Sequence, residues 1–149
     1  MRHVIGFGNP LHGDDGVAAA VCAALSATAL PPDVRVFDAG TRGLDALALL
    51  TDCDEAILID AAWPAGRAGE IRCPDPADLV PEGGLSWHAG GVGALLQALP
   101  LCPGTPPRLR LVTVEAESHR HFAPGLSPPV AAAVAGVVSL LRGYLEDGR

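Results

Sequence analysis

The sequence predicts an α/β protein: a three-layer α/β/α sandwich with a central, mostly parallel sheet of about five strands. Short apolar runs alternate with segments of helical composition along the chain, which is the pattern of strand–helix–strand units. The main apolar runs are continuous, as is typical of strands buried on both faces of a parallel sheet. Strands joined through helices in this way form right-handed crossovers.

The first unit is a strand over residues 4–7, a glycine-marked turn and a helix over 15–27. Gly6 and Gly8 remove side chains where the backbone turns or is approached closely. Asn9 is the only asparagine in the chain, and it suits the turn because its side chain bonds its own backbone. The rest of the sequence is organised around this unit.

Two carboxylates, Asp14 and Asp15, stand at the start of that helix. Aspartate caps helix N-termini, where negative charge gains about 0.3–1 kcal/mol from the helix dipole. For Asp14, capping and a functional role both remain open. One cap residue suffices, so we assign Asp15 to function: its ionised carboxylate can point off the end of the sheet toward a metal ion.

The remaining elements continue the alternation. The alternating Arg and Leu residues after position 107 predict a more exposed strand near a sheet edge. No internal repeat and no second domain is found, so residues 1–149 are expected to form a single domain. We predict strands over 34–37, 56–59, 70–73 and 108–114, and helices over 41–50, 92–99 and from Ser127 to just before Gly148.

Polar residues follow three of the predicted strands. Ligands of parallel sheets gather beyond the carboxyl ends of strands, where Asp38 and Asp60 are expected. For Asp38 a turn or cap role remains open. Capping explains Asp60 less well, because a loop follows it. A histidine beside tryptophan is often a packed core residue. His88 becomes a candidate metal ligand if it lies at the same edge of the sheet as Asp15 and Asp60.

Composition excludes several classes of function. The chain has 49% hydrophobic and 18% charged residues, which indicates a globular protein. A net charge of −7 argues against a nucleic-acid partner, because phosphate binding needs clustered Lys and Arg. The sequence contains no lysine, which excludes Schiff-base chemistry, Ser–Lys dyads and a P-loop. The four cysteines share no CxxC spacing and indicate neither a zinc site nor a disulfide framework.

The sequence also indicates location. Asp14 and Asp15 interrupt any apolar N-terminal run, so no signal peptide is expected. The apolar run over 130–141 is too short to span a membrane. We therefore expect a cytoplasmic, soluble protein with no membrane partner.

The ligand types of Asp15, Asp60 and His88 suit a borderline divalent ion such as nickel, zinc or manganese. Three ligands give modest affinity, so no tightly bound cofactor is expected. Neither G-x-S-x-G nor HExxH is present, so no nucleophile is evident. We expect His119 and His121 to lie in a solvated loop. The residues alone therefore predict a transiently occupied metal site.

Residues 8–16 read Gly-Asn-Pro-Leu-x-Gly-Asp-Asp-Gly, and residues 38–43 read Asp-Ala-Gly-Thr-x-Gly. These stretches resemble the signature and the second motif of the hydrogenase maturation proteases, which trim the C-terminal tail of the nickel–iron hydrogenase large subunit. Asp60 and His88 stand where the family has its acid and its histidine. Residues 117–128 are similar to the closing segment of the family.

This resemblance implies an endopeptidase that removes the C-terminal tail of a nickel-loaded nickel–iron hydrogenase large-subunit precursor, with the substrate's nickel as the recognition feature. It implies that Asp15 and Asp60 are catalytic, in a pair like that of an aspartyl protease, and that both contact the nickel with His88. The residues assigned to substrate binding are Asn9, Asp38, Gly40 and Thr41. Two positions depart from the family: Ala18 replaces a usual glycine, and Asp15 replaces the glutamate of some members.

Two alternative classes share part of the first motif. Peptidyl-tRNA hydrolases begin with a similar strand and Gly-x-Gly-Asn-Pro, but they need a downstream Arg-His-Asn run and a basic face, and this chain is acidic. A dinucleotide-binding module would need G-x-G-x-x-G, but Leu11 replaces the third glycine and Asp38 lies beyond the usual offset.

Overall fold

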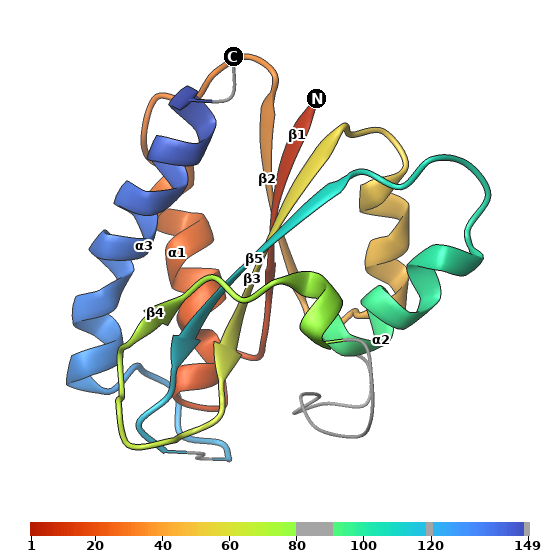
Figure 1. Ribbon diagram of the computed structural model, residues 1–149. Helices are drawn as coiled ribbons and strands as arrows, with labels where there is room; N and C mark the ends of the chain where they lie inside the picture. Colours follow the sequence, from red (N-terminus) through yellow and green to blue (C-terminus); the bar gives the residue numbers. More distant parts are fainter. Residues whose placement is uncertain (80–90, 119–120, 148–149) are drawn as a thin grey trace.

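The fold is a five-stranded sheet with helices on both faces (Figure 1). It was obtained as a computed structural model, and it describes residues 1–79, 91–118 and 121–147. The strands are β1 (Arg2–Phe7), β2 (Val34–Gly40), β3 (Glu55–Ala62), β4 (Ile71–Arg72) and β5 (Arg108–Glu115). The α-helices are α1 (Val17–Ser26), α2 (Val92–Ala98) and α3 (Pro128–Asp147), and the 3₁₀ helices are η1 (Asp14–Gly16), η2 (Leu44–Leu50), η3 (Pro76–Leu79) and η4 (Leu99–Leu101).

The strand order is β2-β1-β3-β5-β4, and the first four strands are parallel. β4 is antiparallel to β5 and closes one edge. The carboxyl ends of β1, β3 and β5 therefore lie at the same edge of the sheet. This architecture confirms the predicted α/β/α sandwich with a mostly parallel sheet.

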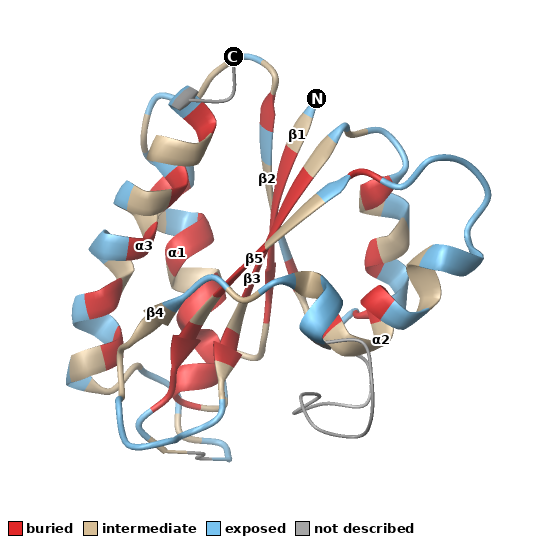
Figure 2. Cartoon of the chain, viewed as in Figure 1, coloured by how far each residue is buried: buried red, intermediate tan, exposed pale blue. Residues whose placement is uncertain are grey.

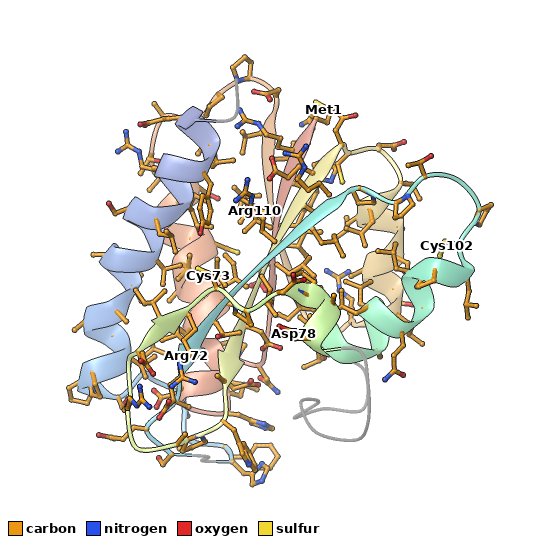
Figure 3. The ribbon with its side chains drawn as sticks, in the orientation of Figure 1. Met1, Arg72, Cys73, Asp78, Cys102 and Arg110 are labelled. Atoms are coloured by element: carbon orange, nitrogen blue, oxygen red, sulfur yellow. The ribbon has the colours of Figure 1, made fainter. Side chains whose placement is uncertain are left out.

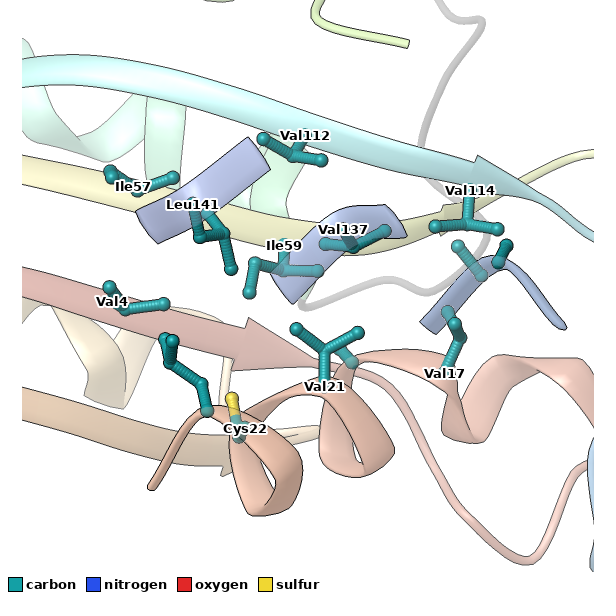
Figure 4. Close-up of a cluster of buried hydrophobic side chains, with 14 of the residues drawn as sticks. Val4, Val17, Val21, Cys22, Ile57, Ile59, Val112, Val114, Val137 and Leu141 are labelled. Atoms are coloured by element: carbon teal, nitrogen blue, oxygen red, sulfur yellow. The ribbon is translucent and has the colours of Figure 1, made fainter. Parts of the chain in front are cut away.

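Two apolar clusters hold the layers together. On one face α1 and α3 pack on the sheet, where Val4, Ile57 and Val112 from the strands meet Val21 and Leu141 from the helices (Figure 4). On the other face η2 and α2 cover a second cluster (Figure 1). Buried residues follow the strands through the centre of the molecule (Figure 2). Each fully buried Val, Leu or Ile side chain contributes roughly 1.5–3 kcal/mol, which explains why the strand sequences are continuously apolar.

Several boundaries differ from the prediction. The first helix is split into η1 and α1, and the second helix is a 3₁₀ helix that begins only at Leu44. Asp60 lies inside β3, because the ladder with β5 pairs it with Thr113 and continues to Ala62. Asp38 likewise lies inside β2, paired with Gly6. Both aspartates are therefore fixed by sheet pairing and do not begin a loop.

β5 is not the edge strand itself. β4 pairs only with Thr113 and Val114, so the amino-terminal half of β5 has no neighbour from β4 on that side. Residues 108–110 are exposed or half-buried, which matches the alternating pattern in the sequence. The two-residue β4 falls within the short strand predicted over 70–73.

The last helix is longer than the apolar run suggested. α3 has 20 residues, and by length and composition alone it could cross a membrane, so the prediction that this segment is too short was wrong. One stripe of α3, including Val130, Val137 and Leu141, is completely buried against α1 and the sheet. The helix therefore contacts its neighbours as a core helix does.

β1 and α1 approach each other closely at Gly6. A Cβ on Gly6 would lie 2.7 Å from the Sγ atom of Cys22 and 3.2 Å from the Cβ of Ala18. Cys22 and Ala18 are both buried. Ala18, the residue that departs from the family pattern, is therefore accommodated because its neighbour on the strand has no side chain.

We predict that Gly6→Ala lowers the free energy of unfolding by about 1–3 kcal/mol, because the added methyl group overlaps the Cys22 sulfur. Cys22→Ala removes that sulfur, so the double variant should recover part of the loss. Urea unfolding of the wild type, the single variants and the double variant measures this coupling. Strictly additive losses would contradict the close contact.

Candidate active site

Asp15 is placed by a sharp return of the chain after β1. Gly8 has φ +134°, and a Cβ there would lie 2.0 Å from the carbonyl oxygen of Asp15, so only glycine fits. The Asn9 N–H donates to Oδ2 of Asp15 at 2.7 Å, and Oδ1 of Asn9 accepts the N–H of Leu11 at 3.0 Å. Asp15 is 3% exposed. Asn9 therefore forms the expected turn, and the turn holds the Asp15 carboxylate.

Asp60 is the second carboxyl group at this edge. It is half-buried on β3, and its Oδ1 accepts the N–H of Ala61 at 2.8 Å. Burial raises the pKa of Asp60 to about 8; the Ala61 hydrogen bond opposes this shift, and the charge of Asp15 adds to it. The structure thus brings Asp15 and Asp60 close enough to interact, and Asp60 retains a proton at neutral pH.

The third predicted ligand, His88, lies outside the described residues. Within the ranges 1–79, 91–118 and 121–147, no three His, Cys, Asp or Glu side chains form a group that could hold a metal ion. Asp15 and Asp60 supply two oxygen donors, which is an incomplete ligand set for a divalent metal. Their arrangement can perform proton transfer, because one carboxyl group is protonated while its neighbour carries charge.

Asp14 has a different role from Asp15. Its carboxylate accepts the N–H of Glu117 at 2.8 Å, the N–H of Ser127 at 2.7 Å and the hydroxyl of Ser127 at 2.9 Å. It is 2% exposed and makes no cap bond to its own helix. Asp14 is therefore a structural anchor that joins the start of η1 to the loop after β5 and to the start of α3.

Of the predicted substrate-binding residues, Asn9 and Thr41 lie on the loops after β1 and β2, whereas Asp38 and Gly40 are in the last residues of β2. Oδ1 of Asp38 accepts the N–H of Gly40 at 3.1 Å, within the carboxyl end of β2. Gly40 has φ +57°, and its carbonyl accepts the N–H of Gly8 at 2.9 Å. Asp38 and Thr41 are exposed. The β2 loop is thereby fastened to the β1 loop, next to Asn9.

Sequence reasoning gave no role to Glu115, at the end of β5. Its Oε1 accepts the N–H groups of Ala65 and Arg67, at 2.8 and 2.5 Å, and Arg72 lies 3.8 Å from its other oxygen. The Arg67 hydrogen bond, followed by that of Ala65 and the nearby arginines, holds the pKa of Glu115 below its usual range. This buried carboxylate fixes the loop that follows Asp60 and β3. A lone glutamate directly after a buried strand was the only signal in the sequence.

A pocket of about 270 Å³ is lined by Asp14 and by residues of the loop after β5. His121, in the same loop, is exposed, as predicted, and His119 lies outside the described residues. The pocket lies where this loop passes the start of η1 and the start of α3. Its lining residues include Gly13, Asp14, Glu117, Ser118, Ala123 and Pro124.

Comparison with known proteins identifies the family. The model of the family described as "HycI: Hydrogenase maturation protease" matches residues 19–143. The chain is 28% identical to the hydrogenase expression/formation protein HupD of Rhodobacter capsulatus, over 95% of this chain and 71% of that protein. It is 29% identical to the hydrogenase 2 maturation protease of Escherichia coli, over 97% of this chain and 90% of that protein.

A solved structure of the family has the same fold. The hydrogenase maturating endopeptidase HybD from E. coli superposes with a TM-score of 0.81 at 28% identity, over 99% of this chain and 94% of that chain. A solution structure of an endopeptidase from E. coli gives a TM-score of 0.85 at 27% identity, over the same shares. These matches favour the predicted family over a peptidyl-tRNA hydrolase or a dinucleotide-binding module. The chain belongs to the hydrogenase maturation protease family and is an endopeptidase of hydrogenase maturation that acts on hydrogenase precursors.

Proposed function

We propose that this endopeptidase removes the C-terminal tail of a nickel–iron hydrogenase large-subunit precursor only after the precursor has received nickel. In this proposal Asp15, Asp60 and His88 contact the substrate's nickel, and the reaction takes place in the cytoplasm without a membrane or nucleic-acid partner. The observation that carries the proposal is the pairing of Asp15 and Asp60 at the carboxyl ends of the central strands, with the Asp60 pKa raised by burial and by its neighbour.

The pair of Asp15 and Asp60 favours a metal ion that the substrate brings over one that the free enzyme holds. Asp60 keeps its proton mainly because burial disfavours its charged form, and the negative charge of Asp15 adds to this effect. A divalent ion neutralises both carboxylates, so its approach displaces that proton. Binding free nickel must overcome this cost, and the enzyme alone therefore holds no metal tightly. Nickel that is already ligated by the precursor brings its own ligands and needs only the remaining donors.

The same pair supplies the acid and base for peptide cleavage. Once nickel has displaced the proton of Asp60, a carboxylate of the pair can accept a proton from an attacking water and then pass that proton to the leaving amide nitrogen. The substrate's nickel acts as a recognition feature and as a Lewis acid on the scissile carbonyl. Asn9 and Thr41 lie on the adjoining loops and Asp38 and Gly40 at the carboxyl end of β2, and we assign these four residues to binding of the tail.

We expect Asp15→Asn and Asp60→Asn to reduce tail removal at least about a hundredfold, because each removes a carboxyl group that takes part in proton transfer and metal contact. Asp60→Asn should leave the fold intact, since the native side chain is already neutral at pH 7. Mass spectrometry of the precursor gives the extent of cleavage, and thermal unfolding gives stability.

The matched control is Asp78→Asn, an exposed aspartate on η3 (Figure 3). It should process the precursor at the wild-type rate. If Asp15→Asn or Asp60→Asn unfolded several degrees earlier yet kept its activity per folded molecule, that residue would be structural.

The nickel requirement is tested by offering one enzyme preparation the nickel-free and the nickel-loaded precursor at the same pH. Only the loaded form should lose its tail. His88→Gln should slow processing of the loaded form at least about tenfold, because glutamine keeps a polar side chain but is a poor nickel ligand. Equal tail removal from both forms would exclude nickel as the recognition feature.

A further inference from the structure

Three large apolar side chains stand exposed on the loops that surround the site. Leu11 is 55% exposed, Trp63 is 56% exposed and Phe122 is 83% exposed. Leu11 follows β1, Trp63 follows β3 directly and Phe122 follows β5. Because these strands are parallel, the three loops lie at the edge of the sheet that carries Asp15 and Asp60 (Figure 1). We call these three residues the apolar rim.

The loops that carry the apolar rim are tied to the fold. The ring of His12 meets the ring of Phe122 edge to face, with centroids 5.2 Å apart, and His12 pairs with Ala123 in a parallel bridge. The residues after Trp63 are fixed by the buried Glu115, which accepts the N–H of Ala65. The rim is therefore presented on an ordered support, which lowers the entropy lost when a partner binds.

Phe122 is held in an unfavourable backbone conformation. Its φ is +52°, and it is the one residue other than glycine with a positive φ in the described parts of the chain. This region is sterically disfavoured for an aromatic residue. The conformation leaves most of the ring in water, where it gains no burial. Strain that exposes an aromatic ring beside an active site is characteristic of a binding contact.

We propose that the apolar rim is the docking surface for the folded body of the hydrogenase precursor, and that it holds the precursor while the tail lies on Asp15 and Asp60. The inference rests on the proposed function, because the same substrate occupies both places. The family acts on hydrogenase precursors, so the loops around the site must meet a large protein.

The chemistry of the rim suits that occupant. The centres of protein interfaces are enriched in aromatic residues and depleted of charge, and a few such residues carry most of the binding energy. The pocket of about 270 Å³ is lined by Ala123 and Pro124, the two residues that follow Phe122 in the chain. A protruding ring next to a hollow gives the surface a shape that an apolar patch of the precursor can match.

Binding of the nickel-free precursor tests the rim, because without nickel the contact with Asp15 and Asp60 does not contribute. Phe122→Asn removes the ring while keeping a residue that tolerates positive φ, and Leu11→Asn is an independent variant on another loop. Each should weaken binding of the nickel-free precursor about tenfold in an equilibrium assay. With the nickel-loaded precursor, each should raise KM and leave kcat unchanged.

Leu101→Asn is the matched control, because Leu101 is 85% exposed but lies in η4, in the segment that leads to the amino end of β5. Its neighbour Cys102 lies on the opposite side of α2 from the sheet (Figure 3). This variant should bind as the wild type does. Unchanged binding in both rim variants, or an equal loss in Leu101→Asn, would overturn the docking surface.

A second copy of the chain is the rival occupant. If the wild type is a dimer in solution and Phe122→Asn makes it monomeric without changing precursor binding, the rim is a self-association surface and the proposal is wrong. Failure of the proposed function gives a different result: precursor binding would still depend on the rim, while the nickel-free and the nickel-loaded precursor would lose their tails equally.

Discussion

The buried carboxylate of Asp14 is the interaction on which the arrangement of the site depends. It joins η1 to Glu117 and Ser127, which follow Asp14 in the chain by 103 and 113 positions. These hydrogen bonds to a charged acceptor are stronger than neutral ones, and breaking them would leave a buried charge unsatisfied. They fix the start of α1, the loop after β5 and the start of α3 relative to one another. The next residue, Asp15, lies close enough to Asp60 for its charge to raise the pKa of that carboxyl group.

The two adjacent aspartates thus have different roles: Asp14 stabilises the fold, and Asp15 belongs to the proposed catalytic pair. Asp14 is satisfied by three donors, whereas Asp60 has a backbone donor and a charged neighbour that opposes its ionisation. Burial, together with the charge of Asp15, raises the pKa of Asp60, so this carboxyl group can hold a proton beside Asp15. Glu115 is the counterpart of Asp14 on the other side: it fixes the loop after β3 by accepting two backbone N–H groups. The apolar rim depends on both anchors, since they hold the loops that carry it.

The sequence predicted the sheet well, because strands buried on both faces are continuously apolar, as in the runs Val4–Phe7 and Ala56–Ile59. It also predicted Asp15 and Asp60 as neighbours, since parallel strands place their carboxyl ends together; whether both act in catalysis stays a prediction. The roles of Asp14 and Glu115 could not be predicted, because their partners are set by tertiary packing. The conformation of Phe122 likewise depends on a loop without periodicity.

Titration of the Asp60 carboxyl carbon by NMR in the metal-free protein tests the coupling of Asp15 and Asp60 most directly. We predict that the pKa of Asp60 lies near 8 instead of the ordinary 3.8. In Asp15→Asn it should fall but stay above the ordinary value, because burial is the larger cause and remains. A pKa of Asp60 in the ordinary range, or one that Asp15→Asn does not change, would contradict a coupled pair and with it the proposed chemistry of the site.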